Sequence, residues 1–473
     1  MNPRLGIAAL ILLLSGCMLG PDYQAPEIDT PDQFLEAGAS GESIANLKWW
    51  ELFDDPAMNE LIAVALEENR DLATAFSRIE EARARYGFER SDLFPTLGGG
   101  VQINRGNTFP GQNVPIGSVQ DLYVFAGQLN YEADIFGKVR RSTRAARAEL
   151  LATEEAARAV MIALIADVAS SYLLLRDLDT RLEISQRTVR TRQASLAIIQ
   201  ARYDNGIVPL LDVNQAEIEE ADAAAQIASF ERAIIETENL INVLVGRNPR
   251  PVLRERNREL QMFPPEVPAG LPSELLVRRP DVRQAEQSLS AQTERIGAAV
   301  AMRFPTLSLT GVLGLASNDL SDLTSGDAKI WSVSAGLFAP IFDAGKNKRR
   351  VEVERAKTEQ ALNRYEQTIL QALREVEDAL AGIRTYHDEA TARHRQAEAA
   401  RSASTLSRAR YDGGVTSYLE VLESDRSLFR AELVESEVRR EQLVSVVELY
   451  KALGGGWELP APEHDEQEVA VNQ

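Results

Sequence analysis

The sequence contains few of the residues with which proteins form disulfides or bind metal ions. Its 473 residues include one cysteine, Cys17, and three histidines. A single cysteine excludes an intramolecular disulfide and a cluster of thiolate ligands. His387 and His394 are two helical turns apart, too far for a shared metal ion without a partner. We also find no nucleophile motif, phosphate-binding loop or zinc-ligand spacing. The sequence therefore predicts no metal, no cofactor, no catalytic residue and no enzymatic activity.

Positive charge and aromatic side chains are also scarce. The formal charge is −20, and aromatic residues make up 6% of the chain. A strong negative charge argues against binding to nucleic acid, whose phosphates require Lys and Arg. Few aromatics suit long helices better than a thick globular core. The composition therefore favours an acidic, largely helical protein.

Two long stretches contain no proline, and Gly382 is their only glycine. They span residues 138–203 and 346–411, each 66 residues long, and lie 208 residues apart in the sequence. Their Ala, Leu, Glu, Arg and Gln content favours helix, and each helix would be about 100 Å long. Matching turns follow them, Arg202-Tyr203-Asp204 and Arg410-Tyr411-Asp412. The chain is therefore predicted to be an internal duplication.

The first long stretch carries a heptad seam from Leu164 to Tyr203. Nine of its twelve positions are apolar, and Arg192 is one of the exceptions. Such spacing predicts left-handed supercoiling against neighbouring helices. The seam alone is equally compatible with an ordinary long coiled coil.

Two segments show the alternation of β-strands. In 96–136 and 306–342, apolar side chains such as Val101, Phe125 and Leu313 alternate with polar or small ones. Strands of about ten residues with an apolar outer and a polar inner face are typical of membrane barrels. The alternative is a pair of soluble hairpins on a periplasmic protein.

Four strands are too few to close a barrel by themselves. Lipid does not tolerate an open sheet edge, because its unpaired N–H and C=O groups cost several kcal/mol each. Closed membrane barrels begin at about eight strands. Several chains are therefore expected to share one barrel, of eight, twelve or sixteen strands for a dimer, trimer or tetramer.

The N-terminus indicates lipidation. Arg4 precedes an apolar run that ends in Leu14-Ser15-Gly16-Cys17, too short to span a membrane. This pattern resembles the lipobox of bacterial lipoproteins, which implies cleavage before Cys17 and its acylation. Met18 after the cysteine fits delivery to the outer membrane. A signal peptide without lipidation is the alternative.

These patterns predict the following order of segments. They are a signal peptide (1–16), a lipidated N-terminal tether (17–55), a first repeat (56–246), a connector (247–270), a second repeat (271–457) and a polar tail (458–473). Within the first repeat we expect a helix, the hairpin 96–136, the long helix 138–203 and the return helix 210–245. The second repeat contains a helix, the hairpin 306–342, the long helix 346–411 and the return helix 418–453.

Several short motifs complete the pattern. They are Gly20-Pro21-Asp22-Tyr23, Trp49-Trp50, Phe-Pro-Thr before each hairpin (94–96 and 304–306), the paired Arg-Tyr-Asp turns and the segment 450–457. Together they resemble the TolC-like outer-membrane factors, in the NodT-type lipoprotein branch that works with resistance-nodulation-division efflux pumps. The resemblance covers essentially all of the mature chain. It implies a homotrimer with a twelve-stranded β-barrel in outer-membrane lipid and an α-helical barrel crossing the periplasm. It also implies a periplasmic adaptor and an inner-membrane transporter as partners.

The resemblance assigns roles to residues around the two turns. Leu419 would form an apolar constriction, and Glu420 and Glu423, with Asp212 in the first repeat, would form acidic rings under threefold symmetry. Tyr203, Tyr411, Arg202 and Arg410 would brace neighbouring helices. Gly206, Val208, Gly414 and Val415 would contact the adaptor. The alternatives are helix capping for the glycines and a solvated acidic face for the carboxylates. Thr416-Ser417 departs from the Asp-Asn of several relatives.

The sequence therefore predicts a passive exit channel for small toxic compounds, opened by its partners at the helical turns. One alternative is the same kind of channel serving type I protein secretion. Another is a soluble periplasmic adaptor with a coiled-coil hairpin.

Overall fold

The computed structural model describes residues 18–28, 30–35, 49–106, 119–254, 272 and 274–455. The predicted signal peptide, Cys17, most of the connector and the polar tail lie outside these residues. The chain divides into two compact units, each assembled from three segments. Unit 1 comprises Met1–Glu27, Arg78–Glu154 and Gln284–Glu366, and unit 2 comprises Ile28–Ser77, Glu155–Arg283 and Gln367–Gln473.

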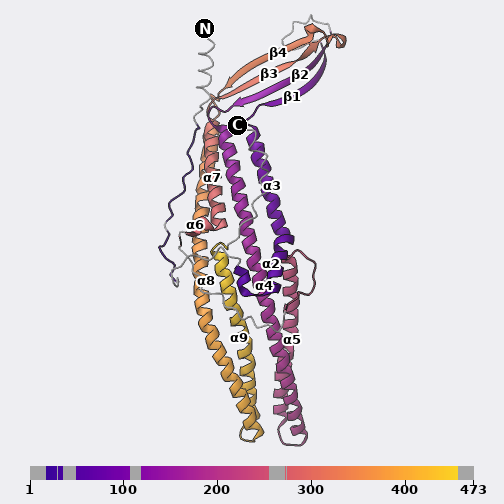
Figure 1. Cartoon of the computed structure of the whole chain (residues 1–473), viewed down its shortest axis with the longest axis vertical. Coiled ribbons are helices and arrows are strands. Elements are labelled where there is room, and N and C mark those ends of the chain that lie inside the picture. The colour runs from indigo at the N-terminus through magenta and orange to yellow at the C-terminus, as the bar shows by residue number, and fades with distance from the viewer. Residues whose placement is uncertain are drawn as a thin grey trace. The chain divides into compact units, whose positions relative to one another are not determined.

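Unit 1 contains a four-stranded antiparallel sheet (Figure 1). Its strands are β1 (Thr96–Gly106), β2 (Gln120–Ala133), β3 (Thr306–Ser317) and β4 (Lys329–Phe338), in the order β1-β2-β3-β4. Two short 3-10 helices, η2 (Leu320–Asp322) and η3 (Gly326–Ala328), lie between β3 and β4. The two predicted hairpins thus join through β2 and β3, and β1 and β4 form the edges.

The register places most of the large apolar side chains of the four strands on one face. Val101 is opposite Phe125, and Phe125 is opposite Leu315 on its other side. Leu313 is likewise opposite Trp331 on β4. Residues one position along the strands point to the other face, and the pairs there include Asn130–Thr310 and Thr310–Ser334. The predicted alternation therefore extends across both hairpins as one apolar and one polar face.

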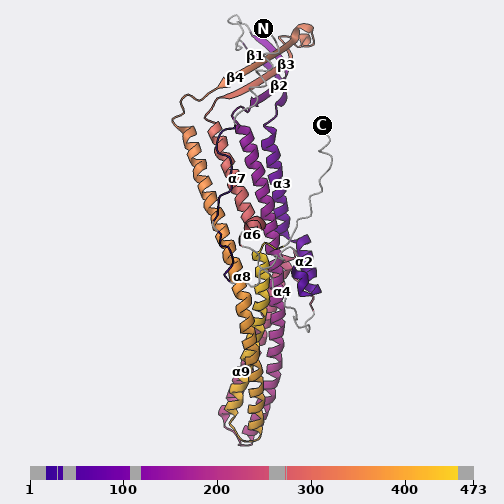
Figure 2. The same ribbon diagram turned by 60° about the vertical axis from the view of Figure 1, so that its left-hand side comes forward.

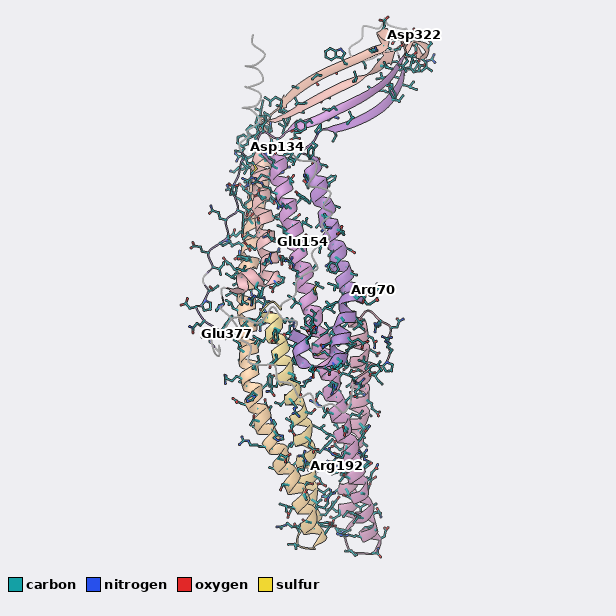
Figure 3. All side chains as sticks on the ribbon, viewed as in Figure 1. Arg70, Asp134, Glu154, Arg192, Asp322 and Glu377 are labelled. Atoms are coloured by element: carbon teal, nitrogen blue, oxygen red, sulfur yellow. The ribbon has the colours of Figure 1, made fainter. Side chains whose placement is uncertain are left out.

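The helices of unit 1 begin or end at this sheet. α4 (Lys138–Asp204) follows β2 and α8 (Lys346–Asp412) follows β4, and each helix has 67 residues. Asp134, labelled in Figure 3, accepts hydrogen bonds from the backbone N–H groups of Val139 and Arg140 at 3.1 and 2.9 Å. Asp134 lies within the predicted hairpin 96–136, but β2 ends at Ala133 and the Asp134 carboxylate caps α4 instead.

Unit 2 is a bundle of long helices. α5 (Leu210–Leu244) returns beside α4, and α9 (Tyr418–Ala452) returns beside α8, as both ribbon views show (Figure 2). Within the part of the chain that the structure describes, α4 has an apolar window long enough to cross a membrane, but 61% of it is buried. Val168, Tyr172 and Leu175 are fully buried there. This stretch therefore forms the core of the bundle.

The core of unit 2 also includes part of the predicted N-terminal tether 17–55. Residues Trp49–Phe53 form a 3-10 helix, η1. Trp49, Trp50 and Phe53 are buried, and the Trp49 ring stacks on Tyr450 with 5.4 Å between centroids. This part of the predicted tether 17–55 is therefore a packed element, since its aromatic side chains complete the core.

The helix predicted at the start of the first repeat is interrupted. It divides into α2 (Pro56–Glu68) and α3 (Arg70–Ser91) at Asn69, which is extended. The Asn69 side chain accepts from the N–H of Leu72 at 2.8 Å and donates to the carbonyl of Leu244 at 2.8 Å. It therefore starts α3 as an N-cap and fastens it to the end of α5.

The second interruption lies between α6 (Glu274–Arg278) and α7 (Pro280–Ala301). The residue before a proline is disfavoured in helical conformation. Arg279 therefore separates the two helices, and Pro280 begins α7, where its missing N–H has no cost.

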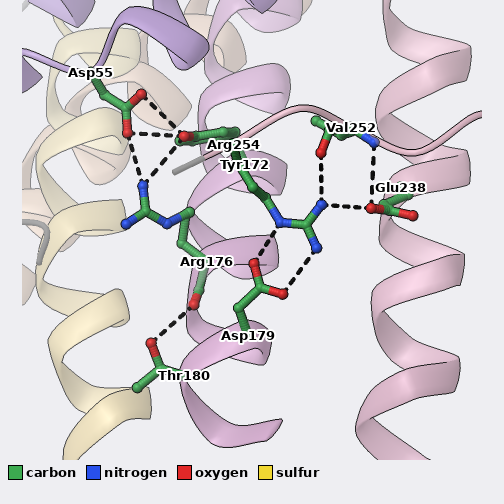
Figure 4. A network of polar contacts seen from close by, with 8 residues as sticks. All are labelled: Asp55, Tyr172, Arg176, Asp179, Thr180, Glu238, Val252 and Arg254. Atoms are coloured by element: carbon green, nitrogen blue, oxygen red, sulfur yellow. Dashed lines mark hydrogen bonds and ion pairs between the residues drawn. The ribbon is translucent and has the colours of Figure 1, made fainter. Parts of the chain in front are cut away.

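Two buried arginines hold elements of unit 2 together (Figure 4). Arg176 binds Asp55, which also accepts a hydrogen bond from the Tyr172 hydroxyl at 2.9 Å. Burial raises the pKa of Tyr172 to about 12, so its hydroxyl remains a donor. Arg254, after α5, binds both Asp179 on α4 and Glu238 on α5. These networks fix the entry to α2 and the exit from α5 against α4.

Candidate functional site at the two helical turns

The turns after α4 and α8 have the same backbone geometry. Gly206 and Gly414 have φ of +73° and +70°. The N–H of Ile207 donates to the carbonyl of Arg202 at 2.9 Å, and its counterpart Val415 donates to Arg410 at 2.9 Å. A glycine with positive φ followed by this long hydrogen bond is the Schellman arrangement. Both glycines are therefore required for capping, whatever else the turns bind.

Apolar side chains are exposed at both turns. Ile207 and Val415 are each 70% exposed, and Leu419, the predicted constriction, is also exposed. Val208, which the resemblance assigns to the adaptor contact, is half-buried and packs against the apolar cluster that includes Ile199. The 208-residue offset pairs Val415 with Ile207 and not with Val208. Ile207 is therefore the exposed apolar residue of the first turn.

The predicted braces come together across the two repeats. The Arg202 guanidinium lies over the Tyr411 ring, 4.6 Å from its centroid, and 4.0 Å from the carboxylate of Asp412. The Tyr411 ring packs on Tyr418, 5.4 Å between centroids. Burial raises the pKa of Tyr418 to about 12. α4 is thus joined to α8 and α9 beside the turns, whereas Tyr203 is exposed.

The carboxylates predicted to form acidic rings have positive partners within the chain. Arg410 Nε lies 3.1 Å from Glu420, which also accepts a hydrogen bond from the Thr416 hydroxyl. Glu423 lies 2.8 Å from Arg426. Arg410 therefore pairs with Glu420, and Thr416, one of the two residues that depart from the family pattern, contributes to the same contact.

Asp212, the predicted acidic residue of the first repeat, lies in the first turn of α5. Its negative charge, after burial and the charges of Asp425 and Tyr411, contributes to the raised pKa of Tyr418 on α9. Among the ion pairs between described side chains, none involves Asp212. Among the described residues, the negative charge of Asp212 is therefore not neutralised by an ion pair, whereas that of Glu420 is paired with Arg410.

A buried charge network lies further along the bundle and was not predicted. Arg192 on α4 has a side chain that is 5% exposed, and its Nη2 lies 3.1 Å from Glu219 on α5, which is 7% exposed. Arg426 on α9 donates to the same carboxylate at 3.0 Å. The Arg192 guanidinium also lies over the ring of Phe429, 5.1 Å from its centroid. The network connects α4, α5 and α9. In the sequence, the only indication of it was that Arg192 occupies a position of the apolar heptad seam.

A groove lies between α4 and the α8–α9 hairpin beside the braces. Its cavity is about 420 Å³ and is lined by Ile198, Ile199 and Val421 together with Arg187, Arg190 and Tyr411. The apolar floor and basic walls could accept an amphipathic partner element. Among the described residues, no group of three or more His, Cys, Asp or Glu side chains is arranged to hold a metal ion.

Comparison with known proteins identifies relatives over nearly the whole chain. The family model described as outer membrane efflux protein matches residues 61–247 and 271–455. The solvent efflux pump outer membrane protein SrpC of Pseudomonas putida is 39% identical over 457 residues, 94% of this chain and 97% of that protein. The cation efflux system protein CusC of Escherichia coli O157:H7 is 33% identical over 453 residues, 94% and 97% of the two chains.

Solved structures give the same result. The outer-membrane channel OprN has a TM-score of 0.88 at 30% identity, covering 93% of this chain and all of its own. The open state of the MtrE outer membrane channel of Neisseria gonorrhoeae has a TM-score of 0.84 at 30% identity, covering 93% and 98%. The matches therefore include both the sheet and the helices that end at the two turns.

Proposed function

The chain belongs to the outer membrane efflux protein family and is an outer-membrane efflux channel with a TolC-like fold, and we propose how it assembles, opens and selects its cargo. The four-stranded sheet is the observation that supports assembly of the chain into a trimer. Among the described residues, β1 and β4 are the two edges of the sheet, and one sheet face is largely apolar. Three copies supply twelve strands, and pairing β4 of one copy with β1 of the next leaves no edge exposed to lipid.

The polar face of the sheet then lines the exit. Side chains on this face include Gln102, Asn130, Thr310 and Ser334, which are uncharged, and Glu132, which pairs with Lys138 at 2.7 Å. A lining of this kind favours neither cations nor anions. Charge selection is therefore assigned to the helical turns.

The helical turns form the periplasmic gate in this proposal. Leu419 supplies an apolar constriction, and Glu420, Glu423 and Asp212 surround it as rings of acidic residues. Arg202, Tyr411 and Arg410 hold the closed state, because their contacts join α4, α8 and α9 within the chain. Tyr203 would take part through a neighbouring copy. The channel hydrolyses nothing, and the energy for transport comes from its partners.

The partners are a periplasmic adaptor and an inner-membrane transporter of the resistance-nodulation-division class. The turns contact the adaptor through the exposed side chains of Ile207 and Val415, positioned by Gly206 and Gly414, with Val208 supporting Ile207 from below. The cargo is small toxic compounds, since relatives of this length are named for the efflux of solvents, toluene and antibiotics. A lipid on Cys17 adds a membrane anchor.

The gate can be tested by single-channel recording of the purified protein in planar bilayers. Arg202→Ala removes the contacts with both Tyr411 and Asp412, so the closed state should become leakier and the mean conductance should rise. Arg158→Ala is a matched control, because it removes an arginine that pairs with Glu155 on the same helix, far from the turn. Unchanged conductance in Arg202→Ala, or an equal rise in the control, would contradict the gate.

A further inference from the structure

The segment that follows Cys17 is bound to unit 1 along its length. We call Met18–Asp22 the strap. The N–H of Leu19 donates to the carbonyl of Phe136 at 3.3 Å. Gly137, with φ of +79°, leaves room for Met18, because a Cβ on Gly137 would lie 2.8 Å from the Met18 Cγ. The first described residue of the chain is thus held where β2 leads into α4.

The strap crosses α7 in direct backbone contact. A Cβ on Gly20, which has φ of +95°, would overlap the Cα of Gly297 on α7. A Cβ on Gly297 would in turn lie 2.9 Å from the carbonyl oxygen of Leu19. Beyond the strap, the Tyr23 hydroxyl donates to Glu286 on the same helix at 3.2 Å. Glycine is needed on both sides because the two backbones touch.

One buried arginine binds the strap by several groups at once. The Arg141 side chain, on α4, is 1% exposed. Its Nε donates to the carbonyl of Leu19 at 3.1 Å and its Nη2 to that of Gly20 at 3.3 Å. Nη2 also lies 2.9 Å from Asp22, and Nη1 lies 2.8 Å from Glu294 on α7. The planar guanidinium holds this set of acceptors in one geometry, which a lysine could not do.

The strap is bound at the base of the sheet, where exposed apolar side chains collect. The Phe136 ring, whose carbonyl accepts from Leu19, packs on Phe304 with 5.0 Å between centroids. Phe94 and Phe342 are exposed beside the ends of β1 and β4. Aromatic residues gather at the two borders of the lipid-facing band of a membrane barrel. The strap therefore ends at one border of that band.

Cys17 directly precedes Met18, the first residue of the strap, in the sequence. We propose that Arg141 is a positioning residue that fixes the strap so that the lipid on Cys17 enters the membrane beside the base of the sheet. This rests on the proposed lipidation of Cys17. The fixed lipid holds each copy at the depth at which its edge strands meet those of the neighbouring copies, and barrel assembly is faster for that reason.

The size of the effect follows from the length of free chain. A flexible insertion of six residues between residues 17 and 18 lets the lipid range over about 14 Å, more than half of the apolar band of about 25 Å. Effective concentration falls roughly as the −3/2 power of linker length, so lengthening one free residue to seven lowers it by about an order of magnitude. Releasing the strap should slow assembly by about tenfold.

The test is a pulse-chase measurement of heat-modifiable trimer formation by the full chain in a Gram-negative host. Arg141→Ala and the six-residue Gly-Ser insertion should each slow trimer formation about tenfold, and the two together should slow it no further. The same Arg141→Ala is then made in a non-lipidated background, with Cys17→Ser and a leader that is cleaved without lipidation. There it should change the rate by less than about twofold. An equal slowing in both backgrounds would show that Arg141 only supports the fold and would overturn the proposal.

Arg254→Ala is the matched control. Arg254 is also a buried arginine with two carboxylate partners, Asp179 and Glu238, but it lies in unit 2. Its replacement should have the same effect on the rate with and without the lipid. If the Arg141→Ala protein does not accumulate, the six-residue insertion serves as the test, because it leaves the contacts of the strap intact. An unchanged rate of trimer formation in the insertion variant would refute the proposal.

Mass spectrometry of the wild-type protein separates this inference from the proposed channel function. If Cys17 carries no acyl chain, the positioning role is refuted, while conductance in bilayers still tests the channel.

Discussion

The buried network of Arg192, Glu219 and Arg426 allows a sharp prediction about the stability of the bundle near the turns. Glu219→Gln removes the carboxylate that both arginines share. Arg192 is then left with a positive charge in a site where burial already lowers its pKa. The carbonyl of Glu219, which also accepts a hydrogen bond from Arg192, is unchanged by the substitution.

The free-energy cost of losing the ion pair with Glu219 differs between Arg192 and Arg426 because the two side chains are buried to different extents. Breaking a buried ion pair by removing one partner costs about 3–5 kcal/mol. The Arg426 side chain is 50% exposed, and exposed pairs contribute about 0–1 kcal/mol. Glu219→Gln should therefore be far more damaging than Arg426→Ala. A double replacement, Arg192→Met with Glu219→Leu, should recover most of the loss, because it leaves no buried charge.

Hydrogen exchange of backbone amides in α4, α5 and α9 measures this directly as the free energy of local opening. At about 1.4 kcal/mol per factor of ten, Glu219→Gln should lower protection about 100- to 3,000-fold near residues 192 and 219. Arg426→Ala should lower it by about fivefold at most. Equal effects of the two substitutions, or no recovery in the apolar double variant, would refute the reasoning.

Three further predictions concern the sheet, a helix cap and the response to pH. Leu313→Arg, on the apolar face, should destabilise the inserted barrel by about 2–4 kcal/mol and lower the yield of heat-modifiable trimer, whereas Thr310→Arg, on the polar face, should be tolerated. Asn69→Ala removes the cap of α3 and should lower the free energy of unfolding by about 1 kcal/mol in denaturant titration. Tyr172 has a pKa of about 12 in the fold against a reference value of 10.0. Its stabilisation should be complete below about pH 10 and decline by about 3 kcal/mol as the pH rises to about 12. Tyr172→Phe should reduce the decline in thermal melts across that range by this amount, while Tyr418, whose pKa is also raised to about 12, keeps its own contribution.

Much of the fold could be predicted from the sequence because its elements are long and strongly periodic. Strict alternation in 96–136 and 306–342 identified the two hairpins, and the same odd-numbered positions share a face across β2 and β3. The absence of proline in the long helices left nothing to interrupt them. The break at Asn69 could not be predicted, because its cause is a contact with Leu244, 175 residues away. The division of the chain into signal peptide, tether, repeats and tail remains a prediction.

The site was harder to predict because it depends on contacts between the repeats. Turn glycines and exposed apolar residues follow from the local sequence, and a strict use of the 208-residue offset would have pointed to Ile207 in place of Val208. The pairing of Arg202 with Tyr411 requires the relative position of two helices, which no local pattern provides. The same holds for Arg192 and Glu219, which lie on different helices. The roles of these residues in gating remain proposals.

Packing within unit 2 changes along the bundle in a way that favours opening at the turns. Far from the turns, a large apolar cluster around Trp49, Tyr172 and Tyr450 holds α2, α4, α5 and α9 together. Next to the turns, the corresponding cluster is small and is built around Ile199 and Tyr418. There, beside this small cluster, the α8–α9 hairpin is joined to α4 by the braces, in which Arg202 lies over Tyr411 and 4.0 Å from Asp412. Polar contacts near a surface contribute little each and re-form readily, whereas separating a large apolar cluster costs about 25 cal/mol for every Å² exposed. Movement of α8 and α9 is therefore least costly at the turns, which supports the proposed gate at this end of the bundle.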